Sequence, residues 1–239
     1  MKKKYLKRRF LTALAFLQSF SSDGQIQKTP AIVKDGLIAH YPLSGNCRDE
    51  SGNEQHALPF NTLLTANRRG TPNTAYHFSG YNSFISCPLK NNDFQSLTIS
   101  CWAYWNASHL QGAIFFAGLS SMDGFGLIVG DGVCGMGDRL CLLLGGNPGG
   151  TCGAWVAPNP IPVHQWMHLA LVKKDNDWRI FMDGKLAGSV THGYNKPSVP
   201  FQIGGTIENK RGSIIGDISD LLFYNRALSD AEIMTLYNR

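Results

Sequence analysis

The feature that most constrains this chain is a set of three apolar runs in its last third. They cover residues 166–172, 178–188 and 216–228. The second run is divided by Asp183-Gly184, a pair that closes a two-residue type I′ hairpin because both central positions need positive φ. The three runs therefore predict β-strands, with a hairpin in the middle one.

Alternating or continuous apolar residues predict further strands along the chain. Leu37, Ala39, Tyr41 and Leu43 alternate on one face of the first strand, and the run 97–105 is apolar on both faces, which suits a covered strand. The other expected strands are 76–78, 83–87, 113–117, 125–129, 139–144, 152–156, 202–204 and 216–224.

Turn and capping residues suggest how some of these strands connect. We expect 76–78 and 83–87 to pair around the turn at 79–82, and 139–144 to pair with 152–156 across a glycine-rich segment. Ser229 and Glu232 have the spacing of a capping box, so a short helix is expected at the C-terminal end.

Three motifs together resemble one known family. They are W-x-H-x-A-L-V at 166–172, the D-G-K hairpin at 183–185 and the closing strand with Y-x-R-A-L-S at 224–229. An N-terminal element, 36–43 running into 46–53, fits the same pattern. Residues 36–238 thus resemble the laminin-G-like, concanavalin A-like lectin/glucanase jelly-roll family. The resemblance implies an all-β jelly-roll sandwich of two antiparallel sheets with a short C-terminal helix.

The N-terminus has the order of a secretory signal peptide: a basic block, an apolar stretch too short to span a bilayer, and small residues. We expect a signal peptide at 1–21, a linker at 22–35 and the jelly-roll domain at 36–239, with an uncleaved N-terminal anchor as the alternative. The mature protein should begin between about Ser21 and Gln27.

Removing residues 1–21 leaves 16 basic and 17 acidic residues. The basic character of the chain therefore belongs to the export signal and gives no support to nucleic-acid binding. No later segment is apolar enough to cross a membrane, so a secreted or cell-surface protein without stable membrane insertion is expected.

Export would place the six cysteines in an oxidising compartment, where disulfides persist. We expect at least two disulfides, one of them involving Cys152. In the expected hairpin of 139–144 and 152–156, Cys141 and Cys152 come close to facing each other, while Cys134 would pair elsewhere. For Cys101, within an apolar strand, a buried free thiol and a bridge are both open.

Catalytic motifs are missing from the sequence. Glycosidases with this type of fold place acids in an E-x-D-x-x-E strand, and neither that pattern nor Gly-x-Ser-x-Gly occurs. His168 alternates with Trp166 and Ala170 and is interpreted as a structural histidine. A non-enzyme is expected.

The loop at 46–53 combines carboxylate, amide and main-chain oxygens around a glycine, which suits a calcium ion. The resemblance implies that a structural calcium joins this loop to the closing strand, with Asn46, Asp49, Asn53 and Asp220 as ligands. Ser219 occupies a neighbouring position that is often acidic in the family. The alternative is that Asp49 only forms an Asx-turn.

Sugar binding on a sandwich usually needs exposed flat aromatic rings beside amides and carboxylates. The resemblance places Trp166 in the core, and Trp102 is expected to pack as well. The expected ligand-binding residues are therefore Trp155, Trp105, Asn147 and Asn159, although a packing role is open for each tryptophan.

These observations predict a secreted, non-catalytic recognition module that binds a glycan or an extracellular protein through loops at one edge of the sandwich. A cell-surface structural or adhesive domain that binds protein is the first alternative. A divergent glycoside hydrolase is the second.

Overall fold

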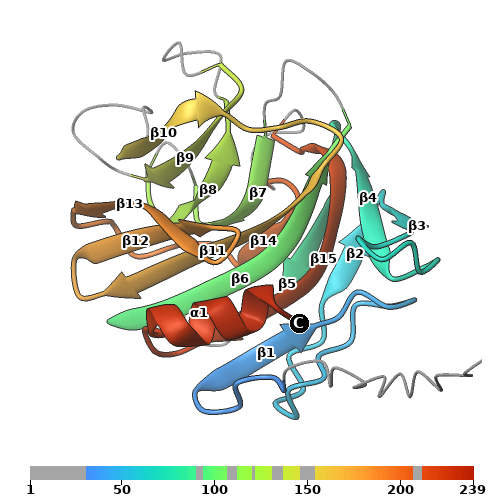
Figure 1. Ribbon diagram of the computed structural model, residues 1–239, viewed down its shortest axis with the longest axis horizontal. Coiled ribbons are helices and arrows are strands. Elements are labelled where there is room, and N and C mark those ends of the chain that lie inside the picture. The colour runs from blue at the N-terminus through green and yellow to red at the C-terminus, as the bar shows by residue number, and fades with distance from the viewer. Residues whose placement is uncertain are drawn as a thin grey trace, which may run out of the picture.

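The computed structural model describes residues 31–89, 94–106, 112–119, 122–130, 137–145, 154–206 and 212–239. Within these residues the chain forms two antiparallel β-sheets and one short helix (Figure 1). The predicted jelly-roll sandwich is confirmed. The expected signal peptide, residues 1–21, lies outside the described residues.

The first sheet, sheet A, has eight strands. They are β1 (Leu37–Tyr41), β3 (Leu63–Thr65), β4 (Ala75–Ser79), β6 (Ser96–Trp105), β11 (Trp166–Lys174), β12 (Asp177–Met182), β13 (Lys185–Thr191) and β15 (Ile215–Tyr224). Their order across the sheet is β13-β12-β11-β6-β15-β4-β3, and β1 pairs with β15 outside this path.

The second sheet, sheet B, has seven strands. They are β2 (Leu58–Phe60), β5 (Phe84–Cys87), β7 (Gly112–Ala117), β8 (Phe125–Val129), β9 (Arg139–Leu144), β10 (Trp155–Pro160) and β14 (Phe201–Ile203). Their order is β10-β9-β8-β7-β14-β5-β2. Pro158 and Pro160 lie on β10, an edge strand, where a missing N–H is tolerated.

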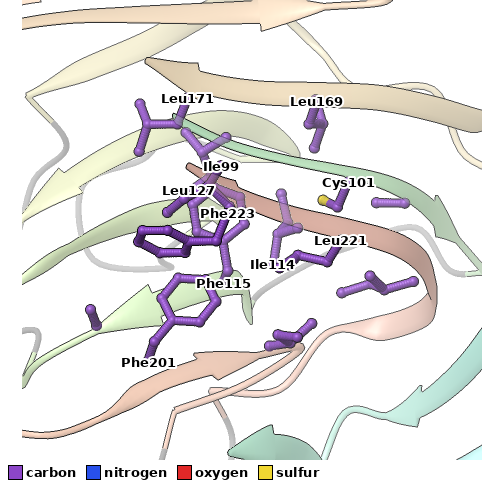
Figure 2. Packing of buried hydrophobic residues seen from close by; sticks show 14 of the residues in the cluster. Ile99, Cys101, Ile114, Phe115, Leu127, Leu169, Leu171, Phe201, Leu221 and Phe223 are labelled. Atoms are coloured by element: carbon purple, nitrogen blue, oxygen red, sulfur yellow. The ribbon is translucent and has the colours of Figure 1, made fainter. Parts of the chain in front are cut away.

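Side chains from the facing surfaces of both sheets interleave to form the core (Figure 2). Phe223 of sheet A packs against Phe201 of sheet B, with 5.4 Å between their ring centroids, and Phe201 packs in turn against Phe115 at 5.7 Å. Because successive strand residues point to opposite faces, alternate residues of the long central strands, such as β6, β11 and β15, enter this core. The other residues lie on the outer faces of the sandwich.

The hairpin predicted at Asp183-Gly184 is confirmed. Asp183 has φ of 48° and Gly184 has φ of 73°, and the two residues join β12 to β13. The loop thus has the positive φ values that a type I′ turn requires at both central residues.

The helix α1 (Asp230–Tyr237) covers part of the outer face of sheet A. Its predicted capping box is present: the Ser229 hydroxyl accepts from the N–H of Glu232, and the Glu232 carboxylate accepts from the N–H of Ser229. Ile233 and Leu236 are buried against residues of β11, β12 and β15. Among the described residues, no helix is long and apolar enough to span a membrane.

The expected pairing of 76–78 with 83–87 is wrong. β4 belongs to sheet A and β5 to sheet B, so residues 79–82 carry the chain from one sheet to the other. Tyr76 and Phe78 enter the core from one side, and Ile85 and Cys87 enter it from the other. The apolar alternation fitted a hairpin equally well, because each strand buries one face in either arrangement.

The cysteines also differ from expectation. β9 and β10 pair as predicted, but Cys141 lies opposite Val156, and Cys152 lies outside the described residues. The proposed Cys141–Cys152 proximity therefore finds no support in the strand register. Cys47, Cys87 and Cys101 are buried free thiols. The expectation of two disulfides is wrong, because the three remaining cysteines can form only one bridge within the chain.

Candidate functional site

The loop after β1 is organised around the Asp49 carboxylate. Its Oδ1 accepts from the main-chain N–H groups of His40 and Ser51 at 2.9 and 2.8 Å. Its Oδ2 accepts from the N–H of Gln55 at 3.0 Å and from the Ser51 hydroxyl at 2.9 Å. Burial raises the pKa of Asp49, but these hydrogen bonds outweigh burial and hold the pKa below its ordinary value.

The second expected calcium ligand, Asp220, has partners of its own. Its Oδ1 lies 2.9 Å from Nε2 of His40, and its Oδ2 lies 3.4 Å from Nη1 of Arg239. Burial raises the pKa of Asp220, but the hydrogen bond from His40 and the charge of Arg239 lower it below its ordinary value. The main chain of Asp220 has φ of 51°, in the left-handed region that Asp tolerates better than most residues.

These contacts do not fit a calcium ion shared by Asp49 and Asp220. The main chain of His40 holds one carboxylate and its ring holds the other, so both are already in use. Asn46 Oδ1 accepts from the N–H of Arg48, and Asn53 donates to the main chain of β1. In the part of the chain that is described, no group of three His, Cys, Asp or Glu side chains could hold a metal. The hydrogen bonds favour the Asx-turn alternative, and calcium binding stays a prediction.

The expected sugar-binding residues are not brought together. Trp105 has 0% exposure and points into the core, so its placement on a binding surface is wrong. Trp155 is half-buried, packs against the core and lies against Gly188 of β13, where it leaves no room for a Cβ. Asn159 is exposed on β10, and Asn147 lies outside the described residues.

The outer face of sheet A instead carries a row of five residues, one from each of five neighbouring strands. The strand register aligns them directly across the sheet. The row consists of Leu63 on β3, His77 on β4, Asp217 on β15, Tyr104 on β6 and Trp166 on β11. We call this set the cross-strand row.

The cross-strand row combines aromatic rings with a polar pair. The rings of Tyr104 and Trp166 are both partly exposed, with 5.5 Å between their centroids. Nδ1 of His77 lies 2.6 Å from Oδ1 of Asp217. Burial raises the pKa of Asp217 above its ordinary value, while the hydrogen bond and charge of His77 oppose that shift. Leu63 ends the row as a 70% exposed side chain.

Strand parity was the signal that could have located this row. Ala103 and Trp105 point into the core, so Tyr104 between them must point outward; Met167 points inward, so Trp166 must point outward. The expectation that Trp166 lies in the core is therefore wrong, whereas Trp102 is buried as expected. Trp102 faces outward as well, but Arg68 and Tyr237 cover it.

His168 is structural, as predicted. It is 1% exposed, and its Nε2 lies 2.8 Å from the Ser100 hydroxyl. Burial lowers its pKa from 6.5 to about 3, with the nearby Asp220 opposing that shift and Arg68 adding to it. His168 is therefore neutral in the folded protein at any ordinary pH.

This burial predicts acid sensitivity. Below pH 6.5, His168 takes up a proton in the unfolded chain but stays neutral in the folded protein. The contribution of this group to the free energy of unfolding is therefore complete above pH 6.5 and falls by about 1.4 kcal/mol per pH unit toward pH 3. Urea unfolding should show a loss of about 2 kcal/mol from this group between pH 7 and 5. In His168→Asn this pH-dependent loss of stability should disappear. In His164→Asn, a change at an exposed histidine with positive φ, it should persist. An unchanged pH profile in His168→Asn would contradict the assignment.

The chain has the architecture of a concanavalin A-like sandwich. The family profile of the concanavalin A-like lectin/glucanases superfamily, of the laminin G type, matches residues 79–234, more than half of the sequence. The chain belongs to this family. No curated protein matches the sequence.

Several solved structures share the fold. Domain 4 of AbnA, a GH43 extracellular arabinanase from Geobacillus stearothermophilus solved with arabinotriose, has a TM-score of 0.66 at 18% identity, over 84% of this chain and 98% of that one. Trypanosoma rangeli sialidase with sialic acid gives 0.62 at 19% identity, over 87% of this chain and 33% of that one. The binding domain of botulinum neurotoxin serotype D gives 0.60 at 14% identity, over 85% of this chain and 52% of that one. The chain thus spans about a third of the sialidase and half of the toxin domain.

Proposed function

We propose that this protein is a secreted, non-catalytic recognition module that binds carbohydrate through the cross-strand row of sheet A. The observation that carries the proposal is the alignment of two partly exposed aromatic rings with a hydrogen-bonded Asp–His pair in one register row. Secretion rests on the expected signal peptide at residues 1–21.

The row offers both kinds of contact that a sugar needs. A pyranose has an apolar C–H face, which packs on a flat aromatic ring, and a rim of hydroxyl groups, which needs hydrogen-bond donors and acceptors. Trp166 and Tyr104 supply the rings. Asp217 supplies acceptor oxygens, and His77 supplies a ring nitrogen that fixes the orientation of the carboxylate.

The position of the row on the sheet supports a preformed surface. Tyr104 and Asp217 each have a paired residue on both neighbouring strands of sheet A, and Trp166, the first residue of β11, is paired with Tyr104 of β6. Side chains held in this way lose little conformational freedom on binding. Domain 4 of the GH43 arabinanase, which has the same fold, was solved with arabinotriose, and this agrees with a sugar-binding use of the sandwich.

Glycan-array binding tests the proposal. Wild-type protein should bind a subset of glycans. Tyr104→Ala and Trp166→Ala should each weaken that binding by about tenfold, because packing of a sugar on an exposed ring contributes on the order of 1 kcal/mol or more. Asp217→Asn should also weaken binding, because it removes a charged acceptor.

Tyr81→Ala is the matched control, since Tyr81 is 58% exposed on the turn between β4 and β5 and is not part of the row. It should leave glycan binding unchanged. Equal losses in Tyr81→Ala and Tyr104→Ala would contradict the proposal, as would unchanged binding in both row variants.

Two other functions would give different results in the same assay. A structural or adhesive domain would bind no glycan and would retain a protein partner. A glycoside hydrolase would degrade a polysaccharide and would need two carboxylates aimed at one glycosidic bond. The cross-strand row contains a single carboxylate, Asp217, which favours recognition over hydrolysis.

A further inference from the structure

A second polar site lies beside the cross-strand row, at a break in sheet A. One edge of β15 pairs first with β4, through residues 215–218, and then with β1, through residues 221–224. Ser219 and Asp220 lie between these two stretches, where the register of β15 also shifts against β6. A cavity of about 230 Å³ opens at this break, and its lining includes Ser219, Asp220 and Arg239, the last of which follows α1.

Arginine side chains dominate the cavity. Arg68, Arg69 and Arg239 line it, together with the side-chain carboxylate of Asp220. Arg68 and Arg69 both donate from Nη2 to the main-chain oxygen of Arg239, at 2.8 Å for Arg68. Two guanidinium groups thus converge on one oxygen atom, which is how arginines hold an oxyanion.

Two observations indicate that the Arg68 guanidinium is held in place and is repelled by the neighbouring guanidinium groups. The guanidinium of Arg68 stacks 4.1 Å from the centre of the Trp102 ring, which fixes its position. Burial lowers the pKa of Arg68, and the neighbouring charges of Arg69 and Arg239 lower it further, although Asp220 opposes them. Added negative charge would relieve this repulsion.

A buried hydroxyl completes the site. Ser219 lines the cavity, is 2% exposed, and its Oγ has no hydrogen-bond partner within the described residues. An unsatisfied buried hydroxyl is unfavourable, and a ligand oxygen in the cavity could accept a hydrogen bond from it. Each guanidinium also has further N–H donors, because it carries five.

We propose that Arg68, Arg69 and Ser219 bind the oxyanion of an acidic sugar, a carboxylate or a sulfate group. The inference rests on the proposed carbohydrate binding and adds a preference for acidic glycans. Ser219 and Asp217 lie two residues apart on the same face of β15, about 7 Å along the strand. One oligosaccharide can therefore contact the cross-strand row and present its acidic group to the arginines.

Paired ligands test this inference. Isothermal titration should compare oligogalacturonate with its methyl ester, and a sulfated chondroitin oligosaccharide with its desulfated form. At least one acidic member should bind about tenfold or more tightly than its neutral counterpart, and the difference should shrink as salt is raised. Arg69→Gln, at an exposed side chain, should abolish the difference while leaving the neutral ligand unaffected.

Arg48→Gln is the charge-matched control, because Arg48 is exposed in the nearby loop and does not line the cavity. Equal effects of Arg48→Gln and Arg69→Gln would overturn the inference, since they would indicate a general charge effect. Equal affinity for acidic and neutral forms would also overturn it while leaving the proposed function intact. If inorganic sulfate raises the melting temperature through Arg69 but no acidic oligosaccharide binds, the glycan assignment is overturned.

Discussion

Replacing Phe223 by alanine should lower the free energy of unfolding by about 3–5 kcal/mol, the range for removing a large aromatic side chain from a packed core. Phe223 has 0% exposure on β15, between β6 and β1. Its ring packs against Phe201 of sheet B at 5.4 Å and against Phe94 at 5.1 Å. The alanine variant would leave a cavity between the two sheets that the surrounding strands can close only in part.

Urea unfolding of purified variants measures this effect. Phe223→Leu should lose less than Phe223→Ala, because it keeps most of the buried volume. Tyr81→Ala, at an exposed ring, should lose little. A loss below about 1 kcal/mol in Phe223→Ala would mean that the two sheets are not held together at this position.

The fold could be predicted because its determinants are local. Asp183-Gly184 fixes a hairpin, the Ser229 and Glu232 capping box fixes the start of α1, and the alternation in the closing strand fixes which residues enter the core. Each of these signals lies within about ten residues. Their order along the chain then matched one sandwich family, which the family match at 79–234 supports.

Sheet membership was less predictable. A turn such as 79–82 can close a hairpin or carry the chain to the opposite sheet, and the apolar pattern of the flanking strands is the same in both cases. What decides is the competition for partners: β4 pairs with β3 and β15, whereas β5 pairs with β2 and β14. Those partners are distant in sequence, with β15 more than 130 residues beyond β4.

The candidate site was missed for a related reason. The position of Trp105 at a strand end favours an exposed ring, although its parity with Ala103 places it in the core. Tyr104, Asp217 and His77 are unremarkable separately, and only the strand order β11-β6-β15-β4 brings them into one row. The arginine cavity could not be read from local sequence either, because it depends on where β1 ends and β4 begins along β15.

Replacing Asp49, in the loop after β1, is expected to cause the second large loss of stability. The carboxylate accepts four hydrogen bonds, three of them from main-chain N–H groups, and the residue is 7% exposed. Asp49→Ala leaves these donors without an acceptor, and the N–H of His40 is buried. We expect a loss of about 2–3 kcal/mol in the free energy of unfolding. Asp49→Asn keeps one acceptor oxygen and should lose less.

The same variants distinguish the two interpretations of this loop when unfolding is measured with added calcium and with chelator. If the carboxylate serves an Asx-turn, the deficit of Asp49→Ala relative to wild type should be equal under both conditions, because hydrogen bonds to main-chain N–H groups need no metal. If the loop binds calcium, calcium should raise the stability of the wild type alone, because an ion that binds only the folded state stabilises it by mass action. Asp220→Asn would then also lose the calcium response.

The hydrogen bonds from His40 to both carboxylates lead us to expect the same deficit of Asp49→Ala with calcium and with chelator. A deficit that appears only in calcium would contradict that expectation and assign the loop to the metal.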